Sequence, residues 1–456
     1  MRFPKPSFKL NDRGKGDKVL LQYLKRNTSI GFLSRKTKKL ICKIDDSSNM
    51  NKAKTRDLLL KHIWPAVLED ALWILKKNDS REWPKGGKDR IIGTFFDKAS
   101  LGVTELQEVL SGFSDFEGVM YGASPEQYRD HVVHSFRVWI IGQGLLKSCF
   151  GGRLIADTKL HSTITSKEWE CMWALVALCH DIGYPLSQLE RVNERARKAF
   201  TQQGLLPQGD LRFAFSQQMQ PFHDTVIRLM ASKPVILAES ARPPKGEDKS
   251  KEENIYVTHL QNKYYLKLLK SFDNLDHGVV SSLLISKALV YFLESDLCHD
   301  WWSPLSEEDA RQFLIRREIL RAIASHTCPD IYHLTFNTLS FILYMADEIQ
   351  CWGRPTLTKL QEEPAGIMNG QVEVKEFGDT RISIIITTDD DDHWGNKEKK
   401  AISKNWIGRL RKMLRLAVDT PKLKKSYLLF QVRNKHDQKC YLELKDAKLR
   451  GPKLEG

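Results

Sequence analysis

Residues 166–185 read SKEWECMWALVALCHDIGYP, and this stretch decides the fold. The preceding Thr165 forms a capping-box pattern with Glu168, so a helix is expected to begin here. Apolar residues dominate the next turns, and the helix is expected to stop where Gly-Tyr-Pro follows the pair His180 and Asp181. Adjacent side chains on a helix diverge by about 100°. At the end of a helix, however, both side chains can bend toward one point, which suits a shared metal ion.

Polar residues also stand inside other apolar, helical patterns. Upstream, His134 lies in HVVHSFRVWIIGQG, and downstream His277 lies in DHGVVSSLLISKAL. His326 comes near the end of EEDARQFLIRREILRAIASHT and continues its apolar stripe. Asp347 stands in the apolar run TLSFILYMADEI, where an ionised carboxylate costs several kcal/mol unless it is paired or bound to metal. Polar groups on the inner faces of helices predict a common partner.

With these motifs the chain resembles the HD superfamily of metal-dependent phosphohydrolases over about residues 125–355. The signature of that family is a histidine in an HSxRV helix, a His-Asp doublet in HDIG and a late aspartate in ADE. The resemblance implies that four residues bind a divalent metal: His134, His180, Asp181 and Asp347. It further implies a mainly α, HD-domain helical core in which His180 and Asp181 are catalytic.

Members of the family with two metal ions add two histidines between the doublet and the last aspartate. By resemblance, His277 and His326 hold the second ion, and His223 is the rival for one of these places. The predicted cofactor is one or two divalent ions, and imidazole with carboxylate ligands favours Mn, Fe, Ni, Co or Zn over Mg. Such an ion lowers the pKa of water and stabilises charge on phosphoryl oxygens, so the implied reaction is attack of water on a phosphate ester or anhydride.

Three residues are candidates for contact with a phosphorylated substrate. Many members of the family carry a phosphate-binding lysine after HDIG, and this chain has Tyr184 there, which leaves the substrate class open. Arg137 follows His134 by about one turn, and Arg354 follows the last aspartate. Both arginines can instead form surface or structural salt bridges.

Other histidines and acids have simpler interpretations. For His131 we favour hydrogen bonding in the core, as support for the site, over metal binding. The run 389–393, DDDDH, is expected to be a solvated loop or the charged start of a helix. A second His-Asp pair, 299–300 in LCHDWWSP, lacks the Ile-Gly that follows the first pair, and its tryptophans and proline indicate a packed corner.

The composition bounds the class of protein. With 456 residues, 41% apolar content and 11 tryptophans, the chain has enough material for two or three packed domains. Its eight cysteines form no C-x-x-C pair, which argues against a zinc ribbon or a disulfide framework and favours a reducing cytoplasm. The first residues show no secretory signal, and no apolar run reaches about 18 residues, so no membrane span is expected.

The net charge of +14 is distributed unevenly. Residues 1–56 hold 16 Lys/Arg against 4 Asp/Glu, and residues 394–456 hold 18 against 6. The body between them, residues 57–393, therefore carries a net charge of −10. We expect the basic ends to form solvated surface, with contact to a nucleic-acid backbone as the alternative.

Three consecutive segments are expected from pattern and composition. Residues 1–53 are a basic N-terminal arm. Residues 54–362 form the helical HD domain, with an N-terminal helical extension and a charged, exposed loop near 239–254. Residues 363–456 form a small appended α+β domain in the order strand-strand-helix-strand-strand.

Three functions are compatible with these features. The first is a metal-dependent phosphohydrolase acting on a nucleotide or cyclic nucleotide. The second is a metal-dependent nuclease on single-stranded nucleic acid, which the basic ends favour and which should lose affinity steeply with salt. The third is a non-catalytic HD module that senses a nucleotide or binds a partner, and that should purify without stoichiometric metal.

Overall fold

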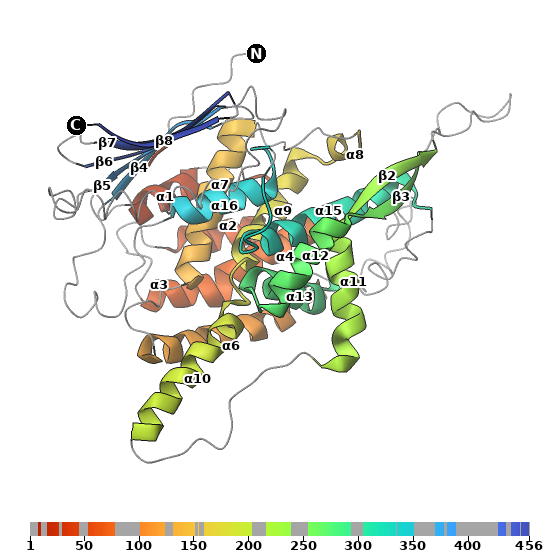
Figure 1. The fold of residues 1–456 in the computed structure, drawn as a ribbon, viewed down its shortest axis with the longest axis horizontal. Coiled ribbons are helices and arrows are strands. Elements are labelled where there is room, and N and C mark those ends of the chain that lie inside the picture. The colour runs from red at the N-terminus through yellow and green to blue at the C-terminus, as the bar shows by residue number, and fades with distance from the viewer. Residues whose placement is uncertain are drawn as a thin grey trace. The chain divides into compact units, whose positions relative to one another are not determined.

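A computed structural model gives the fold, and Figure 1 shows how its elements are arranged. The described residues are 8–10, 16–26, 30–44, 53–77, 101–123, 131–150, 154, 159–202, 216–238, 254–292, 304–333, 335–350, 370–377, 381–388, 427–434, 439–446 and 448–455. The structure is mainly helical, as the sequence predicts. Within the ranges given above, no helix combines the length and the apolar character needed to cross a bilayer.

Contacts group the chain into two compact units. Unit 1 comprises Met1–Trp64, Met120–Leu154 and Ile331–Gly456, and unit 2 comprises Pro65–Val119 and Ile155–Asp330. Each unit is assembled from separate stretches of sequence, which differs from the three consecutive segments expected above. The expected segments were read from local composition, whereas the contacts that define each unit join stretches that are far apart in the sequence.

Unit 2 is a helical body with a small sheet. Its helices are α4 (Trp64–Lys77), α6 (Val103–Ala123), α8 (Lys159–Ser162), α9 (Ser166–Cys179), α10 (Tyr184–Gln202), η3 (Gln217–Met219), α11 (Gln220–Ala231), α12 (Asn262–Asp273), α13 (His277–Ala288), η4 (Val290–Phe292) and α15 (Glu307–Ser325). Strands β2 (Ser232–Ala238) and β3 (Ile255–Leu260) pair antiparallel. The loop predicted near 239–254 joins these strands and lies outside the described residues up to position 253.

Helix α9 begins where the capping pattern predicts. Thr165 Oγ1 accepts a hydrogen bond from Glu168 N at 3.2 Å, and Glu168 Oε2 accepts one from Thr165 N at 2.8 Å. The capping box is therefore confirmed. Every side chain from Glu168 to Cys179 is buried, and the next residue, His180, is the C-cap.

Helix α15 has the same design and lies parallel to α9. Its N-cap, Ser306, accepts a hydrogen bond from Asp309 N at 3.1 Å, and its C-cap is His326. Near the starts of the two helices, Arg311 forms an ion pair with Glu168. At their other ends the rings of His180 and His326 lie 5.1 Å apart. Because α9 and α15 run in the same direction, their C-terminal ends place His180 and His326 next to each other.

Unit 1 combines helices with a six-stranded sheet. The helices are α1 (Gly16–Arg26), α2 (Arg35–Cys42), α3 (Ala53–Leu58), η1 (Leu59–Ile63), α7 (His131–Phe150) and α16 (Leu339–Ile349). The strands are β1 (Phe8–Leu10), β4 (Gly370–Phe377), β5 (Arg381–Thr388), β6 (Tyr427–Asn434), β7 (Lys439–Lys445) and β8 (Lys448–Glu455). The sheet order is β1-β4-β5-β6-β7-β8, and only β5 and β6 pair in parallel among these neighbours.

Strands β4 to β8 lie in the segment expected to be α+β. One face of the central strands is buried, with Ile382 and Ile384 of β5, Leu428 and Phe430 of β6, and Leu442 and Leu444 of β7, and in β5 Ser383 and Ile385 of the other face are buried as well. Because side chains alternate between the faces of a strand, the residues named first share one face of the sheet. The helix expected between β5 and β6 lies outside the described residues.

Part of the expected N-terminal arm is folded. Helix α1 buries Leu20 and Leu21, and α2 buries Ile41. Strand β1 pairs antiparallel with β4 and so belongs to the C-terminal sheet. The expectation of a separate basic arm rested on the charge of this segment. It gave too little weight to the apolar residues that the segment contributes to the core of unit 1.

Candidate metal centre

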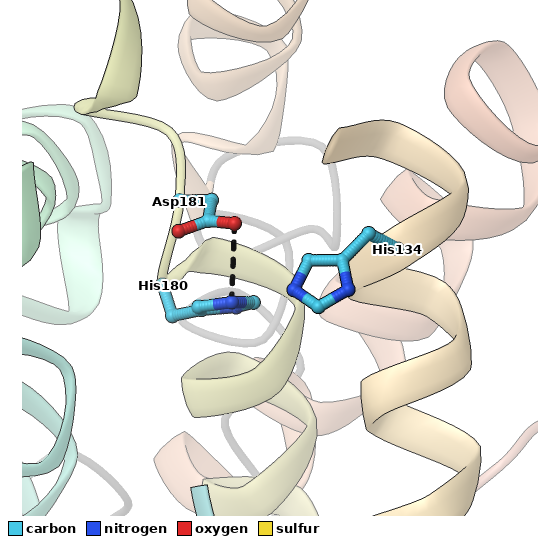
Figure 2. Close-up of side chains that lie close together, drawn as sticks. All are labelled: His134, His180 and Asp181. Carbon is cyan, nitrogen blue, oxygen red and sulfur yellow. Dashed lines mark ion pairs between the residues drawn. The ribbon is translucent and has the colours of Figure 1, made fainter. Parts of the chain in front are cut away.

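The end of α9 places His180 and Asp181 together within unit 2. His180 Nε2 lies 3.3 Å from Asp181 Oδ2, and Figure 2 shows this pair at the end of the helix. Both side chains are buried. The expectation that adjacent residues bend toward one another at a helix end is confirmed.

Two other helices bring histidines to the same carboxylate. His277 is the first residue of α13, and its Nε2 lies 3.2 Å from Asp181 Oδ1. His326 Nε2 lies 3.6 Å from the same oxygen. The ligand atoms of Asp181, His277 and His326 all lie within 4.8 Å of one another, so this group could hold a metal ion. We call His180, Asp181, His277 and His326 the Asp181 cluster.

Backbone carbonyls determine where two of these imidazoles carry their protons. His180 Nδ1 lies 2.8 Å from the carbonyl oxygen of Ala177, and His326 Nδ1 lies 2.5 Å from that of Ile323. A carbonyl oxygen only accepts, so each Nδ1 donates, and in the neutral form of each ring the lone pair is on Nε2. Metal-binding histidines are oriented in this way, with one ring nitrogen held by a backbone carbonyl and the other directed at the ion.

The electrostatics of the cluster keep the carboxylate ionised and His326 neutral. Burial opposes ionisation of Asp181, but the charge and hydrogen bond of His180, with contacts from His277 and His326, hold its pKa well below its usual range. Burial lowers the pKa of His326, and the neighbouring histidines add to this effect while Asp181 opposes it. An ionised carboxylate beside the neutral His326 favours the binding of a cation in this buried site.

His326 tests whether a metal fits the cluster. Its Nε2 is buried, and among the described residues it has no hydrogen-bond partner. Buried polar atoms in proteins are nearly always paired, so this nitrogen needs an explanation. Three imidazoles and one carboxylate form a set of ligands that divalent transition metals accept. The residues present therefore fit a divalent metal.

The helix dipoles favour a cation at this position. His180 and His326 are the C-caps of the parallel helices α9 and α15. The C-terminal end of a helix carries a partial negative charge, which is stabilised by a nearby cation. The Nδ1–H groups of the two histidines also satisfy carbonyls in the last turns, where intrahelical partners run out.

Two glycines permit the close approach of the backbone segments that carry the cluster. A Cβ on Gly278 would lie 2.6 Å from the carbonyl oxygen of Ile323 and 2.9 Å from His326 Nδ1. A Cβ on Gly183 would lie 2.6 Å from the carbonyl oxygen of His277. Real side chains do not tolerate such distances to backbone atoms. Glycine at both positions is therefore a condition for bringing His277 to Asp181.

Ser281 supports the cluster and was not singled out from the sequence. Its Oγ donates to the carbonyl oxygen of His180 at 2.7 Å and accepts from Gly183 N at 2.8 Å. This hydroxyl therefore fixes the turn that holds Asp181 against α13. The signal in the sequence is its spacing, because Ser281 stands one turn after His277 on the same face.

His134 and Asp347 form a pair within unit 1. His134, which is labelled in Figure 2, lies on α7. Its Nε2 lies 2.8 Å from Asp347 Oδ1 on α16. Its Nδ1 lies 2.5 Å from Gln350 Oε1, a contact that the sequence did not indicate. With Nδ1 donating to the amide oxygen, Nε2 donates to the carboxylate in the protonated ring and has its lone pair free for a metal in the neutral ring. The pair therefore repeats, in unit 1, the arrangement of ligands seen in the Asp181 cluster.

The assignment of Arg137 to substrate phosphate is wrong. Arg137 is buried, and its Nε and Nη2 each donate to a carboxylate oxygen of Asp17 at 2.8 Å. A bidentate pair of this kind uses the fork of the guanidinium group. The structural salt bridge, left open above as the alternative, is the correct interpretation, and its partner lies 120 residues away in the chain.

The remaining candidates have different outcomes. Tyr184 begins α10 and is half-buried, with its ring 5.3 Å from that of His277. His223 is buried on α11, 5.4 Å from the ring of Phe272, and is not among the residues grouped around Asp181. His131 is buried at the start of α7. Arg354 and the runs 299–300 and 389–393 lie outside the described residues.

Comparison with protein-family models, with curated proteins and with solved structures finds no match to this chain. The helical fold and its histidine–aspartate clusters are compatible with an HD domain. Membership of that superfamily remains a prediction from the sequence motifs, and the function is argued below from the cluster itself.

Proposed function

We propose that this protein is a metal-dependent phosphohydrolase that cleaves a phosphate ester or anhydride of a nucleotide or cyclic nucleotide. The observation that carries the proposal is the Asp181 cluster, in which three imidazole nitrogens surround one buried carboxylate. The motif resemblance independently selects the same doublet. A divalent ion in such a site lowers the pKa of water and stabilises charge on phosphoryl oxygens.

The residues of the chain have distinct tasks in this proposal. Asp181 turns one oxygen toward His180 and the other toward His277 and His326, so it connects the ligand positions. The carbonyls of Ala177 and Ile323 hold two imidazoles in the required orientation. Fixed ligands of this kind need no reorganisation when the substrate binds.

The substrate is proposed to approach from the side of His277 and Tyr184. The His277 side chain is 23% exposed, whereas that of His180 is fully buried and that of His326 nearly so. Tyr184 is also half-buried and lies edge-on to His277. Its phenol can donate a hydrogen bond to a phosphate oxygen in place of the lysine that many HD hydrolases carry.

We further propose that His134 and Asp347, which the motif resemblance gives as metal ligands, bind divalent metal. Their support is chemical, because the pair in unit 1 offers an imidazole nitrogen and a carboxylate. Replacing Asp347 by Asn should then lower metal affinity as strongly as replacing His326 by Ala. Retention of full affinity in the Asp347 variant would confine the centre to unit 2.

The test is metal analysis followed by a hydrolysis panel. The purified protein should contain divalent metal, and it should hydrolyse members of a panel of nucleoside triphosphates, cyclic nucleotides and oligonucleotides after addition of Mn or Ni. Asp181→Asn, which keeps the size of the side chain, should lose both the metal and the activity. His223→Asn is the matched control, since it removes a buried histidine outside the cluster and should retain both.

The outcomes separate the competing functions. Absence of stoichiometric metal together with no hydrolysis of any compound in the panel would contradict the enzyme and favour a non-catalytic module. Hydrolysis that survives Asp181→Asn would place the chemistry elsewhere in the chain. Turnover confined to oligonucleotides, with a steep dependence on salt, would identify a nuclease.

A further inference from the structure

The second face of the C-terminal sheet carries a row of cations and an aromatic ring. The strand register places Arg381 of β5 beside Tyr427 of β6, Tyr427 beside Lys445 of β7, and Lys445 beside Lys448 of β8. We call these four residues the basic row. With strands about 4.8 Å apart, the row extends over about 14 Å across four strands.

The basic row lies at one end of strands β5 to β8, on the face opposite Ile382 and Leu444, and farther along β5 the residues of this face, Ser383 and Ile385, are buried. Its residues alternate along their strands with buried ones, as Arg381 does with Ile382 and Lys445 with Leu444. Arg381, Lys445 and Lys448 are exposed, and Tyr427 is half-buried. The Arg381 guanidinium lies 5.3 Å from the centre of the Tyr427 ring. The face therefore presents an aromatic group among three cations.

Two features of the row favour an anionic ligand. Lys445 and Lys448 stand directly opposite each other in register, and like charges in that position destabilise a strand pair. Arg450, in β8, is also exposed, and its register partner is the acidic Glu443. The register also places Glu376 of β4 opposite Ser383, two residues along from Arg381, and the exposed Asp446 lies in the turn. An extended polyanion along the row would relieve the repulsion between the two lysines.

We propose that this face binds single-stranded nucleic acid. Cations spaced along a groove or sheet contact the phosphate backbone, and exposed aromatic rings and arginine planes stack on unpaired bases. A duplex offers phosphates but keeps its bases stacked, so it would not use Tyr427. Residues 394–456, with 18 Lys/Arg against 6 Asp/Glu, provide a positive field that attracts such a ligand. The proposal does not depend on the metal centre.

The experiment measures fluorescence anisotropy of labelled 20-nucleotide oligo-dT and oligo-rU with the full chain in EDTA, where metal-dependent cleavage cannot occur. About three phosphate contacts, one for each cation of the row, predict a slope near −2 for log affinity against log salt, at about 0.7 per contact. The double variant Lys445→Glu, Lys448→Glu should reduce affinity by about tenfold or more and make the slope shallower. The two oligonucleotides show whether DNA or RNA is preferred.

A matched control changes the same charge elsewhere. Lys198 and Lys270 have side chains that are 71% and 66% exposed, and Lys198→Glu, Lys270→Glu should reduce affinity by less than about threefold. Tyr427→Ala should weaken binding by about fivefold, and Tyr427→Phe should restore it because the ring still stacks. Equal losses in the two double variants would overturn the proposal. So would absence of binding to either oligonucleotide, or stronger binding to a duplex or to phosphatidylserine vesicles.

Discussion

Buried charge is stabilised differently at the two ends of the parallel helices α9 and α15. At the starting end, Glu168 accepts from Thr165 N and Thr165 Oγ1, both at 2.8 Å, and pairs with Arg311. At the finishing end, Asp181 meets three imidazole nitrogens. The first end is saturated by its own residues. At the second end, three imidazole nitrogens and one carboxylate offer ligand atoms to a cation. This distinguishes a candidate metal site from the structural ion pair at the first end.

The difference has an energetic consequence. A buried ion pair that is fully hydrogen-bonded is costly to break, because one charge then remains buried alone. An unsaturated cluster contributes little to stability until its cation binds, and then binding energy adds to folding energy. The starting end should therefore determine the stability of unit 2, and the finishing end its response to metal.

The largest expected effect comes from breaking the starting end. Arg311→Met leaves the buried Glu168 carboxylate without its cation and should lower the free energy of unfolding by about 3–5 kcal/mol. Urea denaturation in EDTA measures this loss. The double variant Glu168→Gln, Arg311→Met should recover most of it, because no buried charge remains. Equal loss in the single and double variants would show that the charge pair is not the cause.

The next largest effect is the stabilisation of the finishing end by a metal ion. Mn²⁺ at about 100 times its Kd should raise the free energy of unfolding of the native sequence by about 2.7 kcal/mol. His326→Leu should abolish that increase while leaving the metal-free protein as stable as before or more stable. His223→Asn should keep the full increase. A large loss of metal-free stability in His326→Leu would contradict the view that the cluster is unsaturated.

A smaller effect follows from the approach of α13 to α15. Gly278→Ala places a Cβ 2.6 Å from the carbonyl oxygen of Ile323, so the helices must separate. We expect destabilisation of about 1–3 kcal/mol, with at least about tenfold weaker metal binding measured by titration calorimetry. Gly112→Ala is the control, since its Cβ meets nothing within 4 Å. That helix variant should be neutral or stabilised by up to about 1 kcal/mol.

The smallest effect concerns pH at the starting end. Burial opposes ionisation of Glu168, but the hydrogen bond and charge of Arg311, with the bonds from Thr165, lower its pKa below the ordinary 4.5. A lowered pKa stabilises the fold above the unfolded value, and that stability is lost as pH falls through the folded value. The difference in unfolding free energy between the native sequence and Glu168→Gln should be constant from pH 6 to 8 and shrink below about 4.5. A difference that grows on acidification would contradict this assignment.

The sequence predicts local features of the site well. The capping pattern at Thr165 locates the start of α9 and is confirmed, and α15 begins after a similar cap at Ser306. Since these helices are continuous, their starts also determine where His180 and His326 fall. Local hydrogen bonds and helical periodicity act over a few residues, so a single sequence contains them.

Long-range partners are what the sequence does not supply. The sequence leaves the role of Arg137 open between phosphate contact and a salt bridge, because nothing near it in the sequence indicates Asp17, which pairs with it across 120 residues. Gln350 and Ser281 were not singled out, because a glutamine or serine in a helix has many ordinary explanations. The choice of His277 and His326 over His223 rested on family resemblance, and the geometry around Asp181 now supports it.

The interleaving of the two units sets an order for synthesis and folding. Unit 2 ends at Asp330, so all its segments have been made well before the chain is complete. Unit 1 uses the first residues together with the last, and β1 pairs with β4 more than 350 residues later. During translation, residues 8–10 therefore cannot form their strand pair until β4 has been synthesised. A ribosome-bound chain stalled after residue 330 should contain a protease-resistant unit 2 beside an N-terminal segment that is still open to cleavage.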